Sequence, residues 1–505
     1  MVKNISIRLF FIFSLMVSVG VCALPAWGGS PKREMRGVWL ATVWGIDWPS
    51  VTGTTPAIQK KQKAEMMELL DRCEKMNLTS VFFQVRGMAD VMYDSRLEPW
   101  SSFISGKRGM SPGWDPLEFV VNECHKRGLE CYAWVNPFRW SAGTNYDSDI
   151  DRKWKNQGWL LSYGKYTVFN PGIEEVREHI VDICREIVTG YAIDGLVFDD
   201  YFYPNRIPET SDAPDYALWQ EQSPWMSFGD WRRANVHKTV ADIHCMLLDT
   251  RPDVRFGISP AGVAGKSHTS SDKWGMLPCG VKADDWQYKE IYSDPLGWLY
   301  QQTVDFISPQ IYWPTTHSTA PYEPLARWWS NAAGLYGCHF YSSMTLAPLE
   351  KNNTPSQRSE ILRQVEANRA LSMTGEFGSV FYSAKFLGKL SQDIAREHYS
   401  SKALSPMICR KGGEKPLSPS GLSSKGGVLS WREQKCDSGK LQRYAVYAFP
   451  AHLPKEEIMD ARGDGIDSRY LVRISYGCSV AVPMGMGYAV TAIDGDSVES
   501  DPAFL

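Results

Sequence analysis

The sequence predicts an α/β protein in which a (β/α)8 TIM barrel over residues 33–400 precedes a small all-β sandwich over residues 428–505. Three observations support this prediction. Short apolar runs alternate with helix-like segments along the first range. Helical spacing then disappears, and short alternating runs replace it. The length of 505 residues also exceeds one ordinary core, so more than one folding unit is expected.

The first 28 residues have the pattern of an export signal. Lys3 and Arg8 precede an apolar run, Leu9–Val21, that is too short to span a bilayer comfortably. Cys22 offers an alternative as the lipid-modified first residue of a lipoprotein, but the residue before it is larger than is usual there. We therefore expect an exported protein of the periplasm or cell envelope, with no later transmembrane span.

Eight strand-like runs are candidates for the barrel. Each is short and apolar enough for a buried strand. An open doubly wound sheet is the alternative, but no glycine-rich phosphate loop follows the first run. The runs are Gly37–Val43, Ser80–Val85, Glu130–Val135, Gly195–Asp199, Arg255–Ser259, Phe306–Tyr312, Cys338–Met344 and Gly378–Tyr382.

Amphipathic helices are expected between these strands. Ile173–Thr189 is the clearest, because its apolar residues recur at helical spacing and its first turn carries Glu174 and Glu175, which suit the positive end of the helix dipole. The range exceeds the roughly 250 residues usual for this fold, so long loops are expected after strands, at Trp140–Phe169 and Ala261–Glu290. The other helix candidates are Ile58–Met76, Asp230–Thr250, Tyr322–Ala333, Thr354–Ala370 and Leu387–Tyr399.

The composition changes near residue 400. Residues 411–427 are rich in Gly, Pro, Ser and Lys, which predicts a linker. Beyond them, Leu429–Trp431, Tyr444–Tyr447 and Tyr488–Asp494 resemble the core strands of a fibronectin type III domain. That resemblance indicates a fold and says little about function.

Charge and residue usage narrow the class of partner. The 54 Lys and Arg nearly balance the 57 Asp and Glu, giving a net charge of -3, which argues against a nucleic-acid partner. The 20 Trp suit a glycan cleft, because flat rings stack on sugars, although core packing explains part of them. There is no Cys-x-x-Cys pair and no HExxH motif, so neither a metal site nor a cofactor is expected.

The most informative stretch is Tyr191–Pro204, where a buried strand ends in Asp199 and Asp200 and aromatic residues follow. Catalytic groups of barrels lie at the C-terminal ends of strands, and carboxylate pairs cleave glycosidic bonds. Alternation directs Asp199 inward, while the direction of Asp200 stays open. Asp199 is the first catalytic candidate, with Asp200 or Glu98 as its partner; the alternative is that Asp199 only bonds a neighbouring loop. Chitinases carry an acid where this chain has Tyr201, so their mechanism is not transferred.

Other strand ends carry polar and aromatic side chains that are expected to bind substrate. Gln84 and Arg86 are expected to face inward together, where Arg86 either tunes an acid or forms a structural ion pair. Asn136 fits either a sugar-binding amide or a plain turn, and Trp313 fits a sugar platform. The expected substrate-binding set is Arg36, Trp39, Gln84, Arg86, Asp90, Asn136, Arg139, Tyr201, Gln310, Tyr312 and Trp313.

A series of short motifs resembles a known family. They are Met35–Leu40, Phe83–Arg86, Glu98–Ser101, Ala133–Pro137, Asp194–Pro204, Asp230–Arg233, Phe256–Pro260 and Pro309–Trp313. As a set they resemble the glycosyl hydrolase-like 10 domain of bacterial envelope proteins, over about residues 33 to 350. The resemblance implies a TIM-barrel glycosidase, and relatives have been linked to cleavage of peptidoglycan strands stripped of their peptides. A C-terminal fibronectin-like module also fits that family.

Together these observations predict an exported glycoside hydrolase that cleaves a bacterial envelope glycan, with peptidoglycan strands as the first choice, by carboxylate acid/base catalysis. Two alternatives stay open. One is a glycan-binding envelope protein without catalysis, and the other is a barrel glycosidase that acts on plant or host polysaccharides.

Overall fold

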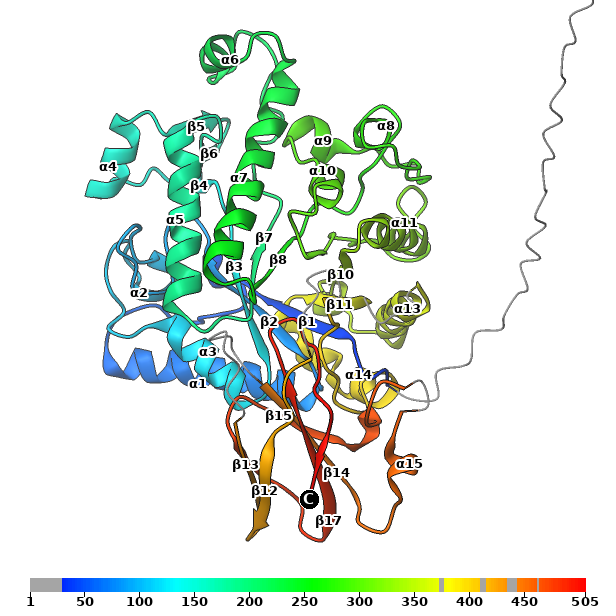
Figure 1. Cartoon of the computed structure of the whole chain (residues 1–505). Coiled ribbons are helices and arrows are strands. Elements are labelled where there is room, and N and C mark those ends of the chain that lie inside the picture. The colour runs from blue at the N-terminus through cyan, green and yellow to red at the C-terminus, as the bar shows by residue number, and fades with distance from the viewer. Residues whose placement is uncertain (1–29, 372–376, 409–414, 434–442, 461–462) are drawn as a thin grey trace, which may run out of the picture.

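The computed structural model describes residues 30–371, 377–408, 415–433, 443–460 and 463–505. The expected export signal over residues 1–28 lies outside the described residues. Within them, a parallel barrel surrounded by helices is followed by antiparallel sheets (Figure 1). No described helix combines the length and the apolar character needed to cross a bilayer.

Eight parallel strands close the barrel, which confirms the predicted fold class. Neighbouring strands pair in the order β1-β11-β10-β9-β8-β7-β3-β2, and β1 pairs with both β11 and β2 to complete the cylinder. Each run expected from the sequence coincides with one of these strands. They are β1 (Met35–Leu40), β2 (Ser80–Arg86), β3 (Glu130–Val135), β7 (Gly195–Phe198), β8 (Arg255–Ile258), β9 (Phe306–Ile307), β10 (His339–Thr345) and β11 (Phe377–Tyr382).

Two strands end earlier than their apolar patterns predict. β9 stops at Ile307, because Pro309 has no N–H for the ladder. The chain returns to the barrel wall at Gln310, which bridges to Ala261 and Ser343. β1 likewise ends at Leu40, and the 3-10 turn η1 (Val43–Gly45) follows. Both early endings leave irregular backbone at the C-terminal end of the barrel.

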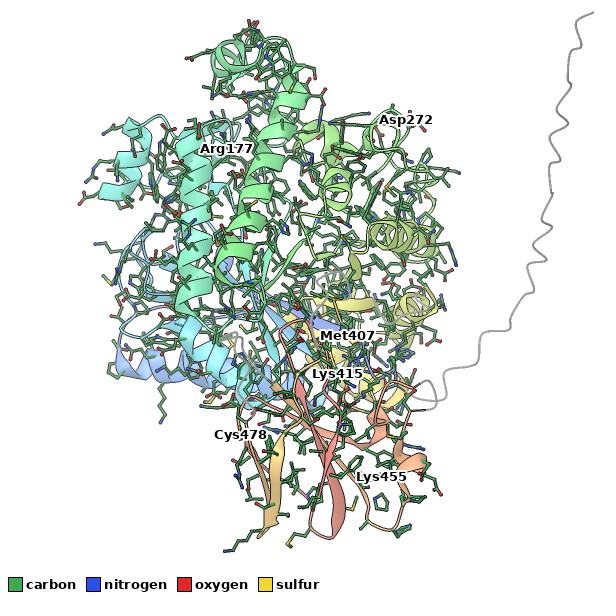
Figure 2. All side chains as sticks on the ribbon, viewed as in Figure 1. Arg177, Asp272, Met407, Lys415, Lys455 and Cys478 are labelled. Atoms are coloured by element: carbon green, nitrogen blue, oxygen red, sulfur yellow. The ribbon has the colours of Figure 1, made fainter. Side chains whose placement is uncertain are left out.

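Helices cover the outside of the barrel between successive strands (Figure 1). In α5 the predicted apolar face is buried, with Val176, Ile180, Ile183, Cys184 and Ile187 packed towards the barrel. Side chains fill the space between strands and helices (Figure 2). The helices of this layer are α1 (Pro56–Lys75), α2 (Ser102–Ser105), α3 (Pro116–Lys126), α5 (Glu174–Gly190), α7 (Phe228–Thr250), α10 (Pro295–Tyr300), α11 (Tyr322–Leu335), α12 (Pro348–Lys351), α13 (Pro355–Leu371), η2 (Ala384–Lys389) and α14 (Ser391–Glu397).

The two long loops expected after strands carry structure of their own. Residues 139–169 form a small antiparallel sheet in the order β4-β6-β5 together with α4. Residues 261–290 carry two short helices, and α6 stands above the barrel at the end of α7 (Figure 1). The elements are β4 (Arg139–Ala142), α4 (Asp149–Asn156), β5 (Leu160–Tyr163), β6 (Tyr166–Phe169), α6 (Tyr216–Gln222), α8 (Ser270–Lys273) and α9 (Trp286–Glu290).

The interior of the barrel is packed with aromatic rings. Two glycines make room for them, because a Cβ on Gly195 would lie 2.2 Å from the Tyr132 ring and one on Gly257 would lie 2.3 Å from the Phe306 ring. The uppermost layer of this core forms the floor of the mouth. The interior cluster comprises Met35, Trp39, Ala41, Phe82, Tyr132, Trp134, Val197, Phe306, Tyr341 and Val380.

The C-terminal module is all-β, with two antiparallel sheets in the orders β12-β13-β16 and β15-β14-β17-β18. The predicted linker, residues 411–427, is described from residue 415, and part of it forms β12, which pairs with β13. A fibronectin type III fold stays a prediction. The elements are β12 (Ser420–Lys425), β13 (Val428–Arg432), β14 (Arg443–Pro450), α15 (Lys455–Ile458), η4 (Ser468–Tyr470), β15 (Leu471–Ser475), β16 (Ser479–Ala481), β17 (Met486–Ile493) and β18 (Ala503–Phe504).

The module covers the N-terminal end of the barrel strands (Figure 1). Glu130, the first residue of β3, forms a buried ion pair with Arg443 of β14. Asp194, just before β7, accepts a hydrogen bond from the hydroxyl of Tyr476 at 2.8 Å. These contacts close the lower end of the barrel, so access to the interior is from the C-terminal end of the strands.

Candidate active site

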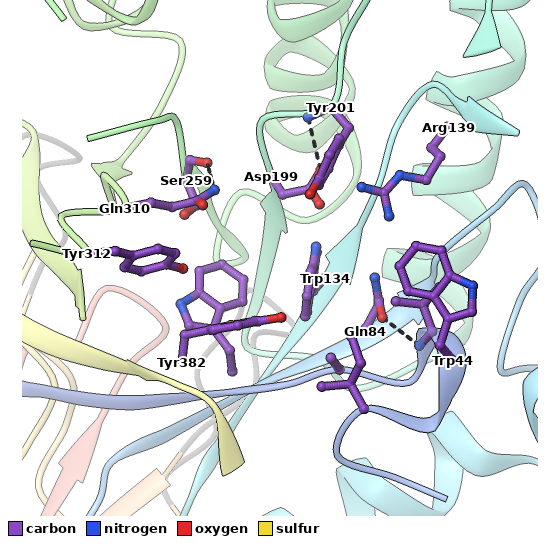
Figure 3. A pocket seen from close by; sticks show the side chains of 14 residues that line it. Trp44, Gln84, Trp134, Arg139, Asp199, Tyr201, Ser259, Gln310, Tyr312 and Tyr382 are labelled. Carbon is purple, nitrogen blue, oxygen red and sulfur yellow. Dashed lines mark hydrogen bonds between the residues drawn. The ribbon is translucent and has the colours of Figure 1, made fainter. Parts of the chain in front are cut away.

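A pocket of about 270 Å³ opens at the C-terminal end of the barrel strands. Aromatic rings make most of its floor and walls, and polar side chains converge from the ends of several strands (Figure 3). This is the position of active sites in barrels of this class. The lining residues are Trp39, Ala41, Val43, Trp44, Ile46, Gln84, Trp134, Arg139, Asp199, Tyr201, Ser259, Gln310, Tyr312 and Tyr382.

Asp199 is the one carboxylic acid that lines this pocket among the described residues. It follows β7 directly, and Val197 two residues earlier belongs to the barrel interior, so regular alternation directs Asp199 inward. The residue is only 3% exposed. Its Oδ1 accepts the backbone N–H of Tyr201 at 3.5 Å, while its Oδ2 has no hydrogen-bond partner among the described residues.

The environment of Asp199 raises the pKa of its carboxyl from 3.8 to about 7. Burial is the largest cause, since it penalises the charged form. Arg139 opposes the shift, the neighbouring Asp200 carboxylate adds to it, and the Tyr201 backbone N–H and the Trp134 indole lower it slightly. A carboxyl that keeps its proton near neutral pH can donate that proton to a leaving group.

Asp200 is the carboxylate next to Asp199 in the chain, and it is not among the residues that line the pocket. It is half-buried, and burial raises its pKa as well, while the Gln310 side chain favours the charged form. The two residues are adjacent in the chain, and the charge of Asp200 contributes to the raised pKa of Asp199. Asp200 therefore stays the candidate partner of Asp199.

Glu98 does not line the pocket, and the structure does not support the catalytic role expected for it. Arg86 holds it in a bidentate ion pair at 2.6 and 2.7 Å, and His179 of α5 contacts the same carboxylate at 2.9 Å. These partners outweigh burial and lower the pKa of Glu98 to about 2. The carboxylate is fully charged and satisfied, so it has no proton to give.

Arg86 also differs from expectation, because it does not face the pocket together with Gln84. The β2–β3 register shifts between Gln84 and Arg86: Gln84 is opposite Trp134, whereas Arg86 is opposite the next residue, Val135. Such a bulge inserts one extra residue and reverses the alternation beyond it. Arg86 therefore points into the outer layer, where it is a structural ion-pair partner.

Four other expected substrate-binding residues lie away from the pocket. Arg36 is buried against Glu34 at 2.7 Å, near the N-terminal end of β1. Asp90 pairs with Arg108 at 3.4 Å beneath a loop. Asn136 is fully buried, and its Oδ1 accepts a hydrogen bond from Gln84. None of these three side chains lines the pocket, although Asn136 contacts Gln84, which does, and the Nδ2 of Asn136 has no hydrogen-bond partner among the described residues.

Trp313 is the fourth of them. Its ring packs against Gly262, where an added Cβ would lie 2.8 Å away, and it is half-buried outside the pocket. It follows Tyr312, which does line the pocket, so the chain directs the two rings to different sides. The sugar platform expected at Trp313 is therefore replaced by a packing contact.

Six of the expected binding residues do meet in the pocket. Gln84 is the most fixed, because its Oε1 accepts the backbone N–H groups of Thr42 and Val43 at 2.9 Å each. Gln310 donates to the carbonyl of Ser259 at 3.1 Å. The six are Trp39, Gln84, Arg139, Tyr201, Gln310 and Tyr312.

Three aromatic residues of the pocket were missed by the sequence analysis. Trp134 of β3 stands on the floor with an indole N–H that has no partner among the described residues. Tyr382, the last residue of β11, stacks on Tyr312 with ring centroids 5.8 Å apart. The strand alternation that selected Gln84 also applies to Trp134, which is its partner in the β2–β3 register.

Trp44 is the third and the most unusual. Its side chain is 57% exposed at the rim, and its backbone is left-handed, with φ 55° and ψ 17°. A bulky residue in that region is strained, and such strain is typical of functional sites. No periodic pattern in the sequence marks a position of this kind.

The described residues contain no group of His, Cys, Asp and Glu side chains suited to holding a metal ion.

Comparison with known proteins agrees with this geometry. The family model described as glycosyl hydrolase-like 10 matches residues 34–357. Glycosyl hydrolase YngK of Bacillus subtilis (strain 168) is 34% identical over 454 residues, covering 87% of each chain. Glycosyl hydrolase DigH of Escherichia coli (strain K12) is 32% identical over 409 residues, covering 75% of this chain and 89% of that one.

Among solved structures, the chain is similar to the PgaB (BpsB) glycoside hydrolase domain of Bordetella bronchiseptica. That similarity has a TM-score of 0.45 and 13% identity, and it covers 72% of this chain and 98% of that one. The sequence relationships are far stronger, and the family model spans the barrel from β1 to β10. The chain therefore belongs to the glycosyl hydrolase-like 10 family and is a glycoside hydrolase.

Proposed function

We propose that this glycoside hydrolase is exported and cleaves the glycan strands of peptidoglycan by carboxylate acid/base catalysis. The observation that carries the chemistry is Asp199, a buried carboxyl with an unpartnered Oδ2 and a pKa raised to about 7, placed in the mouth of the barrel. The substrate is supported by the family resemblance, and export by the signal-like pattern of residues 1–28.

Asp199 acts as the general acid in this proposal. Its Oδ2–H donates the proton to the glycosidic oxygen as the bond to the anomeric carbon breaks. The proton is available at neutral pH because burial keeps the carboxyl uncharged. The indole N–H of Trp134 is directed towards Asp199 (Figure 3) and lowers the pKa of that carboxyl, so it can stabilise the carboxylate that remains after proton transfer.

Asp200 acts as the second carboxylate. Positive charge develops on the sugar ring in the transition state, and a nearby carboxylate stabilises it or activates the attacking water. Asp200 is in electrostatic reach of Asp199 and is the one remaining carboxylate candidate from the strand that carries it.

Aromatic rings at the rim bind the sugars on either side of the cleaved bond. Trp44 and Tyr201 line the pocket with 57% and 48% of their surface exposed, respectively. Exposed rings of this size at a barrel mouth have little packing function, and they offer flat apolar faces for sugar rings. An open rim of this kind suits a polymer better than a single free sugar.

Hydrolysis of defined strands tests the proposal. The protein without residues 1–28 is incubated with peptide-stripped peptidoglycan strands, and new reducing ends are measured. Asp199→Asn should abolish the release with unchanged circular dichroism. Asp285→Asn is the matched control, because Asp285 is also fully buried and has a pKa raised to about 6, yet it lies outside the pocket.

The outcome separates the alternatives. Full activity of Asp199→Asn would remove this residue from the mechanism. Cleavage of plant or host polysaccharides, with stripped strands left intact, would replace the substrate while leaving the glycosidase assignment in place.

A further inference from the structure

Arg139 is a buried cation that faces the pocket without a carboxylate of its own. It opens β4, directly after β3, and only 6% of its surface is exposed. Arg86 and Arg232 are buried as deeply, and each has a carboxylate oxygen at 2.6 Å. Among the described residues no carboxylate oxygen lies within 4.0 Å of the Arg139 guanidinium, although its charge acts on Asp199 and Asp200.

The Tyr201 ring fixes the orientation of this guanidinium. The Cζ of Arg139 lies 3.4 Å from the centroid of that ring, which is a close stacking contact. Stacking occupies one face of the guanidinium, and the N–H groups that do not contact the Tyr201 hydroxyl remain for in-plane hydrogen bonds. Figure 3 shows the guanidinium directed into the pocket beside Tyr201 and Trp44.

The neighbouring carboxyls do not neutralise Arg139 fully. Asp199 keeps its proton up to about pH 7, even though Arg139 favours its charged form. Asp200 also interacts with the charge of Arg139, but neither carboxyl forms an ion pair with it among the described residues, so the guanidinium keeps its capacity to bind an anion in the pocket. A desolvated arginine without a partner is costly, and a carboxylate is the ligand that its planar fork matches best.

We propose that Arg139 binds a carboxylate carried by the substrate sugar, in the subsite beside Asp199. The inference rests on the proposed function. In peptidoglycan, every second sugar carries a lactyl ether whose carboxyl group is bound to the peptide as an amide. Removal of the peptide frees this group as a carboxylate.

Arg139 thereby makes the enzyme selective for stripped strands. A free lactyl carboxylate accepts two hydrogen bonds from the guanidinium, whereas the amide of an intact strand leaves the arginine unpaired. The selectivity arises from the charge of the substrate, and the sugar backbone is the same in both cases.

Two preparations of the same strands test this inference. One is stripped of peptide, and in the other the freed carboxyl groups are then reduced to alcohols. Wild-type kcat/KM should be about 10- to 100-fold higher on the carboxylate strands, the range expected for a charge-assisted hydrogen bond. Arg139→Gln should lose this preference, and Arg139→Lys should retain part of it, because a lysine keeps the charge without the bidentate fork.

A purely electrostatic role for Arg139 gives a different result. If Arg139 only tunes Asp199, then Arg139→Gln moves the alkaline limb of the pH profile upward on both preparations and leaves the preference unchanged. Equal wild-type rates on the two preparations would also overturn the inference while leaving peptidoglycan hydrolysis in place.

Binding by an inactive variant separates this inference from the proposed function. The affinity of Asp199→Asn for the two preparations is measured by isothermal titration calorimetry. Tighter binding to the carboxylate strands supports a role for Arg139 even if no strand is cleaved. Equal binding, or no binding, refutes it.

Discussion

Replacement of Asp199 by asparagine should stabilise the protein at neutral and alkaline pH while it removes the activity. In the unfolded chain this carboxyl ionises near 3.8, but in the folded protein its pKa is about 7. Between these two values the unfolded state has released a proton that the folded state still holds. The free energy of unfolding therefore falls by ~1.4 kcal/mol for each pH unit in this window.

The magnitude follows from the width of the window. About three pH units correspond to ~4 kcal/mol of stability, which is fully present below pH 3.8 and lost once the pH passes about 7. Asparagine occupies nearly the same space and has no charge to bury, so the variant does not bear this cost.

Denaturant unfolding at pH 5 and at pH 8 measures the effect. All other ionisable groups are common to both proteins, so the change in their stability difference isolates the carboxyl of Asp199 and its coupling to Asp200. That difference should shift by about 3 kcal/mol in favour of the asparagine variant between the two pH values. A stability difference that does not vary with pH would show that Asp199 is not held protonated, and it would refute the general-acid assignment.

The remaining predictions concern the alkaline limb of the pH profile, Trp44 at the rim of the pocket and the Arg86–Glu98 ion pair in the barrel wall. Wild-type kcat/KM should fall as the pH rises through about 7, because Asp199 must be protonated to act; a rate that is flat from pH 6 to 9 would contradict this. Trp44→Ala should raise KM several-fold and change kcat less, because the loss of sugar stacking weakens substrate binding by ~1–2 kcal/mol. An unchanged KM on long strands would exclude a sugar-stacking role for Trp44. Glu98→Gln should lower the free energy of unfolding by ~3–5 kcal/mol, because it breaks a buried ion pair. Assayed well below its melting temperature, the folded variant should still cleave strands. Loss of activity in a well-folded variant would restore Glu98 as a catalytic candidate.

Most of the barrel could be predicted from sequence because its signals are local. Each strand is a short apolar run, and each helix has its own periodicity, so the order of the elements follows directly along the chain. The same rule fails at Phe306–Tyr312, where a continuous apolar run contains a proline that ends the strand after two residues. It also fails at residues 420–425, whose polar composition predicts a linker but whose pairing with β13 makes a strand.

The candidate site was predictable where alternation is regular and unpredictable where it is not. Asp199 points inward because β7 is regular up to Phe198. Arg86 points outward because the register between β2 and β3 shifts just before it. The shift depends on how the two strands pair, so the sequence of β2 alone does not reveal it. Trp44 lies in a turn whose left-handed backbone is set by tertiary contacts, so the sequence carried no signal for its position at the rim.

Strand register decides which arginine and carboxylate of this barrel form a structural ion pair and which lie in the pocket. Arg86 and Glu98 are joined at 2.6 Å in the wall, and the pair keeps both groups charged and chemically inert. Arg139 and Asp199 lie in the mouth without such a pair, so the acid keeps its proton and the cation keeps its binding capacity. One inserted residue in β2 turns Arg86 away from the pocket. Unbroken alternation in β7 directs Asp199 into it. Regular pairing of every residue of β2 would have turned Arg86 to the same side as Gln84, whereas the extra residue places it opposite Val135, in the wall. The bulge therefore keeps a second guanidinium out of the pocket that holds Asp199.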